Sequence, residues 1–267
     1  MPTSVGRVHL MERLGDGASA PLVLLHGLSS AGVHYARVLR YLGGATHVVL
    51  PDLPGHGFSD TPKVMDAASI LAGVFEVLDA ALHRPAVLVG NSLGGYVAIR
   101  YALARPEKVA GLMLAAPAGA AMDPVALQAL RGRFSLGSHR EALAFVDALF
   151  ARRRRLRHLY ALGLREYFSL PQTQAVLDQM QLPMMFTGEQ LARLRMPILL
   201  LWGQAERILP EANFEFFKAH LPPHAKFERP AGWGHSGFLD DPKGFAQRLL
   251  RFAAELATGP TASVPRR

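Results

Sequence analysis

The segment AVLVGNSLGGYVA, residues 86–98, decides the fold. It opens with a short apolar run typical of a buried strand, continues as Gly90-Asn91-Ser92-Leu93-Gly94, and runs into a helical pattern. The five residues fit G-x-S-x-G, in which a sharp turn from strand to helix exposes the central serine at the strand tip. Glycines on both sides let the strand and the helix approach closely. The segment therefore predicts Ser92 as a nucleophile at a strand end.

Short apolar runs alternate with helical patterns on both sides of this segment. That alternation predicts an α/β fold with a doubly wound, mainly parallel sheet. The expected strands are residues 7–14, 22–25, 48–50, 86–89, 109–115, 197–201 and 225–228. The expected helices are residues 31–42, 67–82, 93–105 and 243–256.

The stretch 119–195 interrupts the alternation, because it carries helical patterns and no convincing strand. We expect a core of residues 1–118 and 196–257, with 119–195 inserted as a helical cap. Such an insertion would lie over the carboxyl ends of the strands, where open α/β sheets bind ligands. Residues 258–267 are rich in Pro, Ser and Thr and are expected to form a disordered tail.

Composition excludes several classes of protein. Half of the 267 residues are hydrophobic, as in a globular protein with a substantial core. We find neither an apolar run of the ~18 residues that a membrane span needs nor a secretory signal pattern, so we expect no membrane span and a cytoplasmic location. The absence of cysteine excludes disulfides, thiolate metal sites and a cysteine nucleophile.

The net charge of +8 is partly local, since five arginines fall between Arg152 and Arg157. No nucleic-acid reading motif accompanies them. We interpret this run as a solvated helix face, and we expect no nucleic-acid partner.

A catalytic base is expected in the glycine-rich segment GWGHSGF, residues 232–238, which contains His235. In folds with this serine turn the chain order is nucleophile, acid, histidine. His56 is the rival candidate, but it precedes Ser92 in the chain. We therefore favour His235 over His56.

The acid that orients the histidine is expected after the strand at 197–201. Glu206 is the first carboxylate there, and its simplest alternative is a surface glutamate paired with Arg207. Asp123, which lies beyond the strand at 109–115, is the rival. We favour Glu206 and leave Asp123 open.

Two backbone N–H groups are expected to bind the oxyanion that forms during attack by Ser92. One belongs to Leu93, at the start of the helix, where unpaired N–H groups and the helix dipole favour negative charge. The second is expected from Leu28, which follows His26-Gly27 at the end of an early strand. His26 is expected to order this loop.

This ordered set of motifs resembles the α/β-hydrolase fold superfamily, in the esterase-like branch that also holds carbon–carbon bond hydrolases. The matching pieces span residues 7–256; besides the motifs above they include residues 52–59 and 202–210. The resemblance implies hydrolysis, although the superfamily usually has Asp where Glu206 stands. Relatives that open epoxides or remove halides carry Asp in place of Ser92, and carbon–carbon bond hydrolases commonly carry Trp where Ser236-Gly237-Phe238 follow the histidine.

We therefore expect a serine hydrolase that cleaves small to medium apolar acyl or aryl esters through an acyl-enzyme, using Ser92, His235 and Glu206. This chemistry needs neither a metal nor an organic cofactor. The alternatives are a carbon–carbon bond hydrolase of diketones, an acyltransferase with the same residues, and a non-catalytic ligand-binding member of the fold. The sequence does not predict the oligomeric state.

Overall fold

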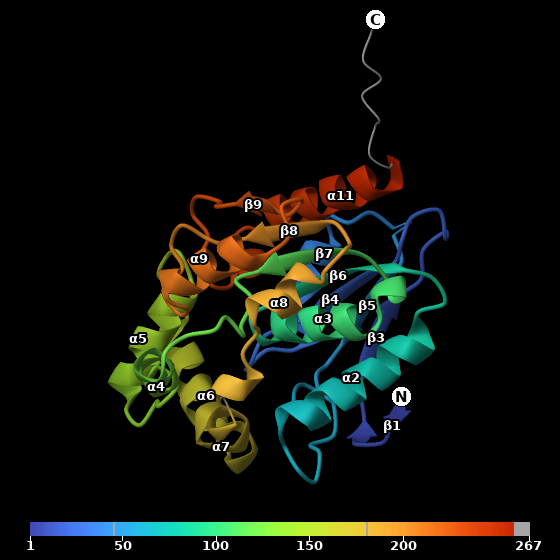
Figure 1. Ribbon diagram of the computed structural model, residues 1–267. Coiled ribbons are helices and arrows are strands. Elements are labelled where there is room, and N and C mark those ends of the chain that lie inside the picture. The colour runs from blue at the N-terminus through green and yellow to red at the C-terminus, as the bar shows by residue number, and fades with distance from the viewer. Residues whose placement is uncertain (45, 180, 259–267) are drawn as a thin grey trace, which may run out of the picture.

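A seven-stranded sheet lies at the centre of the computed structural model, which describes residues 1–44, 46–179 and 181–258 (Figure 1). The strand order is β3-β5-β4-β6-β7-β8-β9, and the pairs are parallel except β3 with β5. The strands are β3 (Leu10–Arg13), β4 (Leu22–Leu25), β5 (Val48–Pro51), β6 (Ala86–Asn91), β7 (Val109–Ala115), β8 (Ile198–Leu201) and β9 (Lys226–Glu228). This is the mainly parallel α/β sheet that the sequence predicts.

Helices cover both faces of the sheet (Figure 1). Those on one face are α2 (Ala67–Ala81), α3 (Leu93–Ala104), α8 (Gly188–Ala192) and α9 (Glu211–His220). Those on the other are the 3-10 helix η1 (Gly32–Tyr35), α1 (Ala36–Leu39), α10 (Gly237–Asp240) and α11 (Pro242–Thr258). A further 3-10 helix, η2 (Pro106–Lys108), leads into β7.

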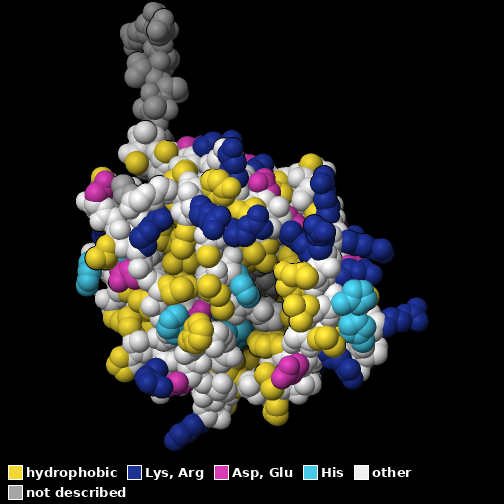
Figure 2. Space-filling model, turned by 180° about the vertical axis from the view of Figure 1, so that it is seen from behind, with side chains coloured by type: hydrophobic (Ala, Val, Ile, Leu, Met, Phe, Trp, Pro, Cys, Tyr) yellow, Lys and Arg dark blue, Asp and Glu magenta, His cyan; other side chains and the backbone are white. Residues whose placement is uncertain are grey.

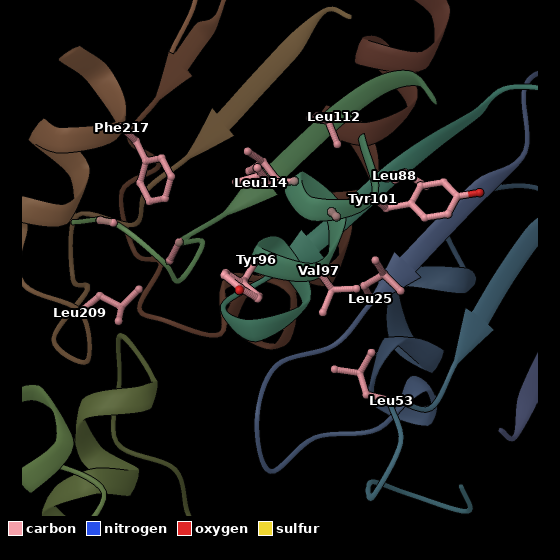
Figure 3. Packing of buried hydrophobic residues seen from close by; sticks show 14 of the residues in the cluster. Leu25, Leu53, Leu88, Tyr96, Val97, Tyr101, Leu112, Leu114, Leu209 and Phe217 are labelled. Atoms are coloured by element: carbon pink, nitrogen blue, oxygen red, sulfur yellow. The ribbon is translucent and has the colours of Figure 1, made fainter. Parts of the chain in front are cut away.

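The strands are buried on both sides, so successive residues of one strand feed two separate cores. In β6, Leu88 packs toward α2 and α3, whereas Val87 and Val89 pack toward α1 and α11. Figure 3 shows this side of the sheet, with Leu88 beside Tyr101 of α3 and Leu25 beside Val97 of the same helix. Full burial of such a side chain contributes about 1.5–3 kcal/mol to the stability of the fold. Packing on both faces therefore holds the strands, and with them the strand tips, in place.

The observed elements differ from the expected ones near the N-terminus. The strand expected at 7–14 is divided, because Gly6–Arg7 (β2) pairs with Pro2–Thr3 (β1) in a separate hairpin and only Leu10–Arg13 joins the sheet. The helix expected at 31–42 consists of η1 and the short α1. Its start is set by Asp52, whose Oδ1 accepts a hydrogen bond from the N–H of Gly32 at 2.7 Å.

At the other end, α11 extends to Thr258. The rest of the tail expected to be disordered, residues 259–267, lies outside the described residues.

Between β7 and β8 the described residues form helices and no strand of the central sheet. These elements are α4 (Pro124–Gly132), α5 (His139–Leu149), α6 (Arg157–Ser169), α7 (Pro171–Asp178), the 3-10 helix η3 (Leu182–Met184) and α8. Figure 1 shows α4 to α7 gathered beside the sheet, away from α11. An isolated parallel bridge between Ala120 and Phe186 closes the base of this segment.

A search of the described helices for a membrane span found none that combines sufficient length with sufficient apolarity.

Candidate active site

Ser92 lies in a strained turn between β6 and α3. Its backbone angles are φ 53° and ψ −116°, a region that side-chain-bearing residues rarely adopt. The turn is held by a hydrogen bond from the Ser92 N–H to the carbonyl of Ala115 at 3.1 Å. Gly94 permits the close approach, since a Cβ there would lie 2.1 Å from the carbonyl oxygen of Leu25. Strand packing and one glycine thus project the serine from the strand tip.

The loop after β4 runs directly beside this turn. A Cβ on Gly27 would lie 3.2 Å from the Cβ of Ser92. Leu28 follows in the chain, and both Leu28 and Leu93 line the pocket that Ser92 also lines. The N–H of Leu93 belongs to the first turn of α3, where intrahelical hydrogen bonds do not reach. The arrangement offers two backbone positions next to the serine for binding negative charge.

His235 and Glu206 are in direct contact although 29 residues separate them. Nδ1 of His235 lies 2.8 Å from Oε2 of Glu206, and both side chains are almost fully buried. Oε1 of Glu206 accepts hydrogen bonds from the N–H groups of Ile208 at 2.7 Å and Leu209 at 3.0 Å. Both carboxylate oxygens are therefore occupied, and the imidazole keeps Nε2 for another partner.

Two opposing effects act on the pKa of Glu206. Burial raises this pKa. The charge of His235, the hydrogen bond to its ring and the N–H groups of Leu209 and Ile208 lower the pKa by more than burial raises it. The net result is a pKa below the ordinary value of a glutamate. Glu206 is consequently an anion at neutral pH.

Asn91 joins the serine turn to the histidine loop. Its buried side-chain Nδ2 donates to the carbonyl oxygens of Ala115 and His235, both at 3.0 Å. Sequence reasoning did not assign it a role, although it stands inside the G-x-S-x-G motif. The amide fixes the backbone of His235 against the strand end that carries Ser92.

The rival residues His56 and Asp123, and His26 beside His56, contact other groups. His56 is buried, its Nδ1 is 3.0 Å from the carbonyl oxygen of Pro54, and its ring packs against that of His26. His26 accepts from the N–H of Leu53 through Nε2 at 2.9 Å, and burial, followed by the charge of His56, lowers its pKa to about 3. Asp123 begins α4, where its side chain accepts a hydrogen bond from the helix N-terminus. All three order local backbone.

A single large pocket contains Ser92 and His235. Its volume is about 670 Å³, and the side chains around it are mostly aliphatic or aromatic. Figure 2 shows a hollow bordered by hydrophobic side chains, with arginine and lysine side chains gathered along one side. Among the lining residues of the described chain are Arg37 and Arg154 but no Asp or Glu. The described residues also contain no group of three or more His, Cys, Asp or Glu placed to hold a metal ion.

The arginine run differs in part from a solvated helix face. Arg152, Arg153 and Arg155 are exposed, as expected. Arg154 instead lines the pocket and lies 2.7 Å from a carboxylate oxygen of Asp240. Arg157 is half-buried and pairs with Asp147, a residue that Arg153 also approaches. Asp147 lies only ten residues before Arg157, whereas Asp240 is 86 residues from Arg154, too far for the local sequence to indicate the pairing.

Comparisons with known proteins agree on one family. The model of a family described as "Alpha/beta hydrolase family" matches residues 22–248. A pimeloyl-[acyl-carrier protein] methyl ester esterase of Chromobacterium violaceum is 32% identical over 255 residues, which cover 90% of this chain and 95% of that protein. A polyketide synthase of Burkholderia thailandensis is 33% identical over 257 residues, but the match covers 91% of this chain and only 12% of that much longer protein.

Solved structures show the same fold. The crystal structure of a serine hydrolase from the hydrocarbon-degrading bacterium Cycloclasticus zankles has a TM-score of 0.80 at 17% sequence identity. The superposition covers 96% of this chain and 97% of that one. Likeness at so low an identity bears on the fold alone.

Proposed function

Because the chain belongs to the alpha/beta hydrolase family, among its esterase-like hydrolases, we propose that it is a serine hydrolase that cleaves carboxylic esters through an acyl-enzyme. The observation that carries this proposal is the contact of 2.8 Å between His235 and the buried Glu206, at the pocket that holds Ser92. A histidine oriented by a carboxylate next to a serine is the arrangement that activates a hydroxyl for acyl transfer.

In the acylation step, Nε2 of His235 takes the proton of the Ser92 hydroxyl while Oγ attacks the ester carbonyl carbon. The N–H groups of Leu28 and Leu93 bind the oxyanion that develops, and each such donor is worth about 2.7–4 kcal/mol of barrier. The carbon–oxygen bond to the alcohol then breaks, and the imidazolium returns its proton to the leaving alkoxide. Glu206 stabilises the imidazolium throughout.

In the deacylation step, a water molecule gives a proton to Nε2 of His235 and attacks the acyl carbon. The second tetrahedral oxyanion collapses, the bond to Oγ breaks, and the proton returns to Ser92. The products are a carboxylic acid and the free enzyme. Because the same residues act in both steps, a variant that lacks one of them slows both.

The pocket lining supports apolar acyl or aryl esters as substrates. Most of its lining side chains are aliphatic or aromatic, and its volume fits a chain of small to medium length. The relative from Chromobacterium violaceum is named for a methyl ester. We therefore propose methyl and aryl esters of alkanoic acids as the first panel, with monomethyl dicarboxylates added because Arg37 and Arg154 line the pocket.

Residues 119–195 are proposed to act as a cap that supplies much of this lining. Phe145, Leu149 and Phe150 line the pocket from the end of α5, and Leu164 and Tyr167 line it from α6. The core supplies Ser92 and His235 to the same pocket. Substrate choice would then depend on the cap, and the chemical step on the core.

The test is the loss of activity in Ser92→Ala. We expect turnover of p-nitrophenyl esters and labelling by a fluorophosphonate to disappear in this variant, since loss of a triad nucleophile costs about 10⁶ in rate. Circular dichroism checks that the variant is folded. Retention of more than a few per cent of the activity would refute the serine mechanism.

Assays on the same purified protein distinguish ester hydrolysis from three alternative functions. An acyltransferase would form more ester or amide than acid when a competing alcohol or amine is present. A carbon–carbon bond hydrolase would cleave vinylogous diketones faster than esters. A ligand-binding protein without catalysis would not react with the fluorophosphonate.

A further inference from the structure

The end of α5 and the turn after it lie between the loop of Glu206 and the loop of His235. Arg207, next to Glu206, donates from Nη2 to the carbonyl oxygens of Asp147 at 2.5 Å and Phe150 at 2.6 Å. On the other side, the N–H of Ser236 donates to the carbonyl of Leu149 at 3.0 Å. Residues 147–154, which we call the clamp, thus hold both loops through backbone groups.

Asp240 binds the clamp and the histidine loop with a single carboxylate. Its Oδ2 accepts from the N–H of Gly234, directly before His235, at 2.8 Å and from the N–H of Ala151 at 3.0 Å. Its Oδ1 accepts from Arg154 at 2.7 Å. The side chain of Asp240 is only 6% exposed, so water does not readily replace these contacts.

The two backbones also touch without intervening side chains. A Cβ on Gly234 would lie 2.7 Å from the carbonyl carbon of Phe150 and 2.8 Å from the nitrogen of Ala151. The guanidinium of Arg154 lies over the ring of Phe150, 4.3 Å from its centre. The histidine loop therefore has no room to shift at this edge unless the clamp shifts with it.

A second arginine, from the proposed cap, contacts the loop that carries Glu206. Arg133, just after α4, donates from Nη1 to the carbonyls of Arg207 and Ile208, both at 2.8 Å. The N–H of Ile208 in turn donates to Oε1 of Glu206. Residues of the proposed cap thereby fix the peptide that holds the carboxylate.

We propose that the clamp and Asp240 position His235 and Glu206 relative to Ser92, so that the cap supports the catalytic geometry instead of opening at this edge. The proposal rests on the serine hydrolase function. Asp240 is a positioning residue, because it acts on the reaction only through the backbone before His235. A misplacement of about 1 Å can cost a hundredfold in rate, which sets the size of the expected effect.

The test compares Asp240→Asn and Asp240→Ala with the matched control Asp241→Asn. Asp241 is the neighbouring carboxylate: its Oδ1 accepts from the N–H of Gly244 at 2.8 Å, at the start of α11, and its Oδ2 accepts from Nε1 of Trp233 at 3.4 Å. We expect kcat to fall about tenfold in Asp240→Asn and about a hundredfold in Asp240→Ala, with KM nearly unchanged. The control should lose stability without losing kcat.

Two further measurements distinguish a positioning role from a general loss of structure. Both are made well below the melting temperature of each variant. The fluorophosphonate should label Ser92 more slowly in both Asp240 variants but still to one equivalent. The downfield NMR signal of the His235 Nδ1–H should shift or broaden in Asp240→Ala and stay in place in Asp241→Asn.

The outcomes are distinct. A native protein that neither hydrolyses esters nor reacts with the fluorophosphonate would refute the proposed function itself. A native protein that reacts, together with Asp240 variants that keep native kcat and labelling rates, would refute the clamp alone. Equal losses of kcat in Asp240→Asn and Asp241→Asn would also overturn it, because the effect would then be general.

Discussion

Replacement of Glu206 by Gln tests the proposed catalytic arrangement most directly. Oε1 of Glu206 accepts two backbone hydrogen bonds, from Ile208 and Leu209, and Oε2 faces Nδ1 of His235. A glutamine has only one acceptor oxygen. To keep both backbone contacts, it must turn its NH₂ group toward Nδ1, which then has to accept a hydrogen bond.

That exchange reverses the tautomer of the imidazole. With Nδ1 as acceptor, the ring proton moves to Nε2, which can no longer take the proton of Ser92. A wrong tautomer of this kind lowers kcat by about 10⁴ in a triad, equivalent to about 5 kcal/mol of barrier at 1.36 kcal/mol for each factor of ten. Substrate binding should change little, because Glu206 does not line the pocket.

The assay is the steady-state hydrolysis of a p-nitrophenyl ester by Glu206→Gln, with Asp123→Asn as control. Asn at position 123 can still accept the hydrogen bond from the N–H of Ala126, so we expect activity within about twofold of native. The reasoning fails if Glu206→Gln stays within tenfold of the native kcat. It fails equally if Asp123→Asn loses as much.

Two further predictions concern stability. Because the pKa of Glu206 is lowered in the folded state, its ionised form stabilises the protein fully above the ordinary value of 4.5, and this contribution is lost as pH falls through the lowered value. The difference in unfolding free energy between native protein and Glu206→Gln, measured in urea, should therefore be constant near neutrality and shrink below pH 4.5; a difference that grows in acid would contradict the sign. Ser92→Gly should melt above Ser92→Ala in calorimetry, since glycine relieves about 1–3 kcal/mol of strain at φ 53° and loses about 0.5–1 kcal/mol through the unfolded chain; the net gain of up to about 2.5 kcal/mol corresponds to about 2–4 °C for each kcal/mol. A lower melting temperature for Ser92→Gly than for Ser92→Ala would mean that the turn is not strained.

Much of the fold was predictable because its strands are short apolar runs with clear ends. The run Leu22–Leu25 reads as a buried strand from sequence alone, and it is one. The bounds of the helix expected at 31–42 could not be predicted in this way, because the start of the helix depends on Asp52, twenty residues further along the chain than Gly32. Local propensity cannot register such a contact.

The candidate site likewise contains residues that the sequence predicts and residues that it does not. Ser92 and His235 stand in glycine-rich motifs, and chain order pointed to Glu206, which lies beside His235 in the structure. Asp240 carried no such signal. Its partner Arg154 is 86 residues away, and the local sequence around that arginine indicated only a solvated basic run.

The hydrogen bonds that join the clamp to the loops of Glu206 and His235 have a consequence for recombination among relatives. A chimera that exchanges residues 119–195 inherits the carbonyls of Asp147 and Phe150 from one parent and Arg207 from the other. It likewise joins one parent's Arg154 to the other's Asp240. A swap meant to transfer substrate preference would therefore have to include positions 207 and 240 together with residues 119–195. Among natural relatives, we expect substitutions at positions 207 and 240 to occur together with substitutions in the clamp.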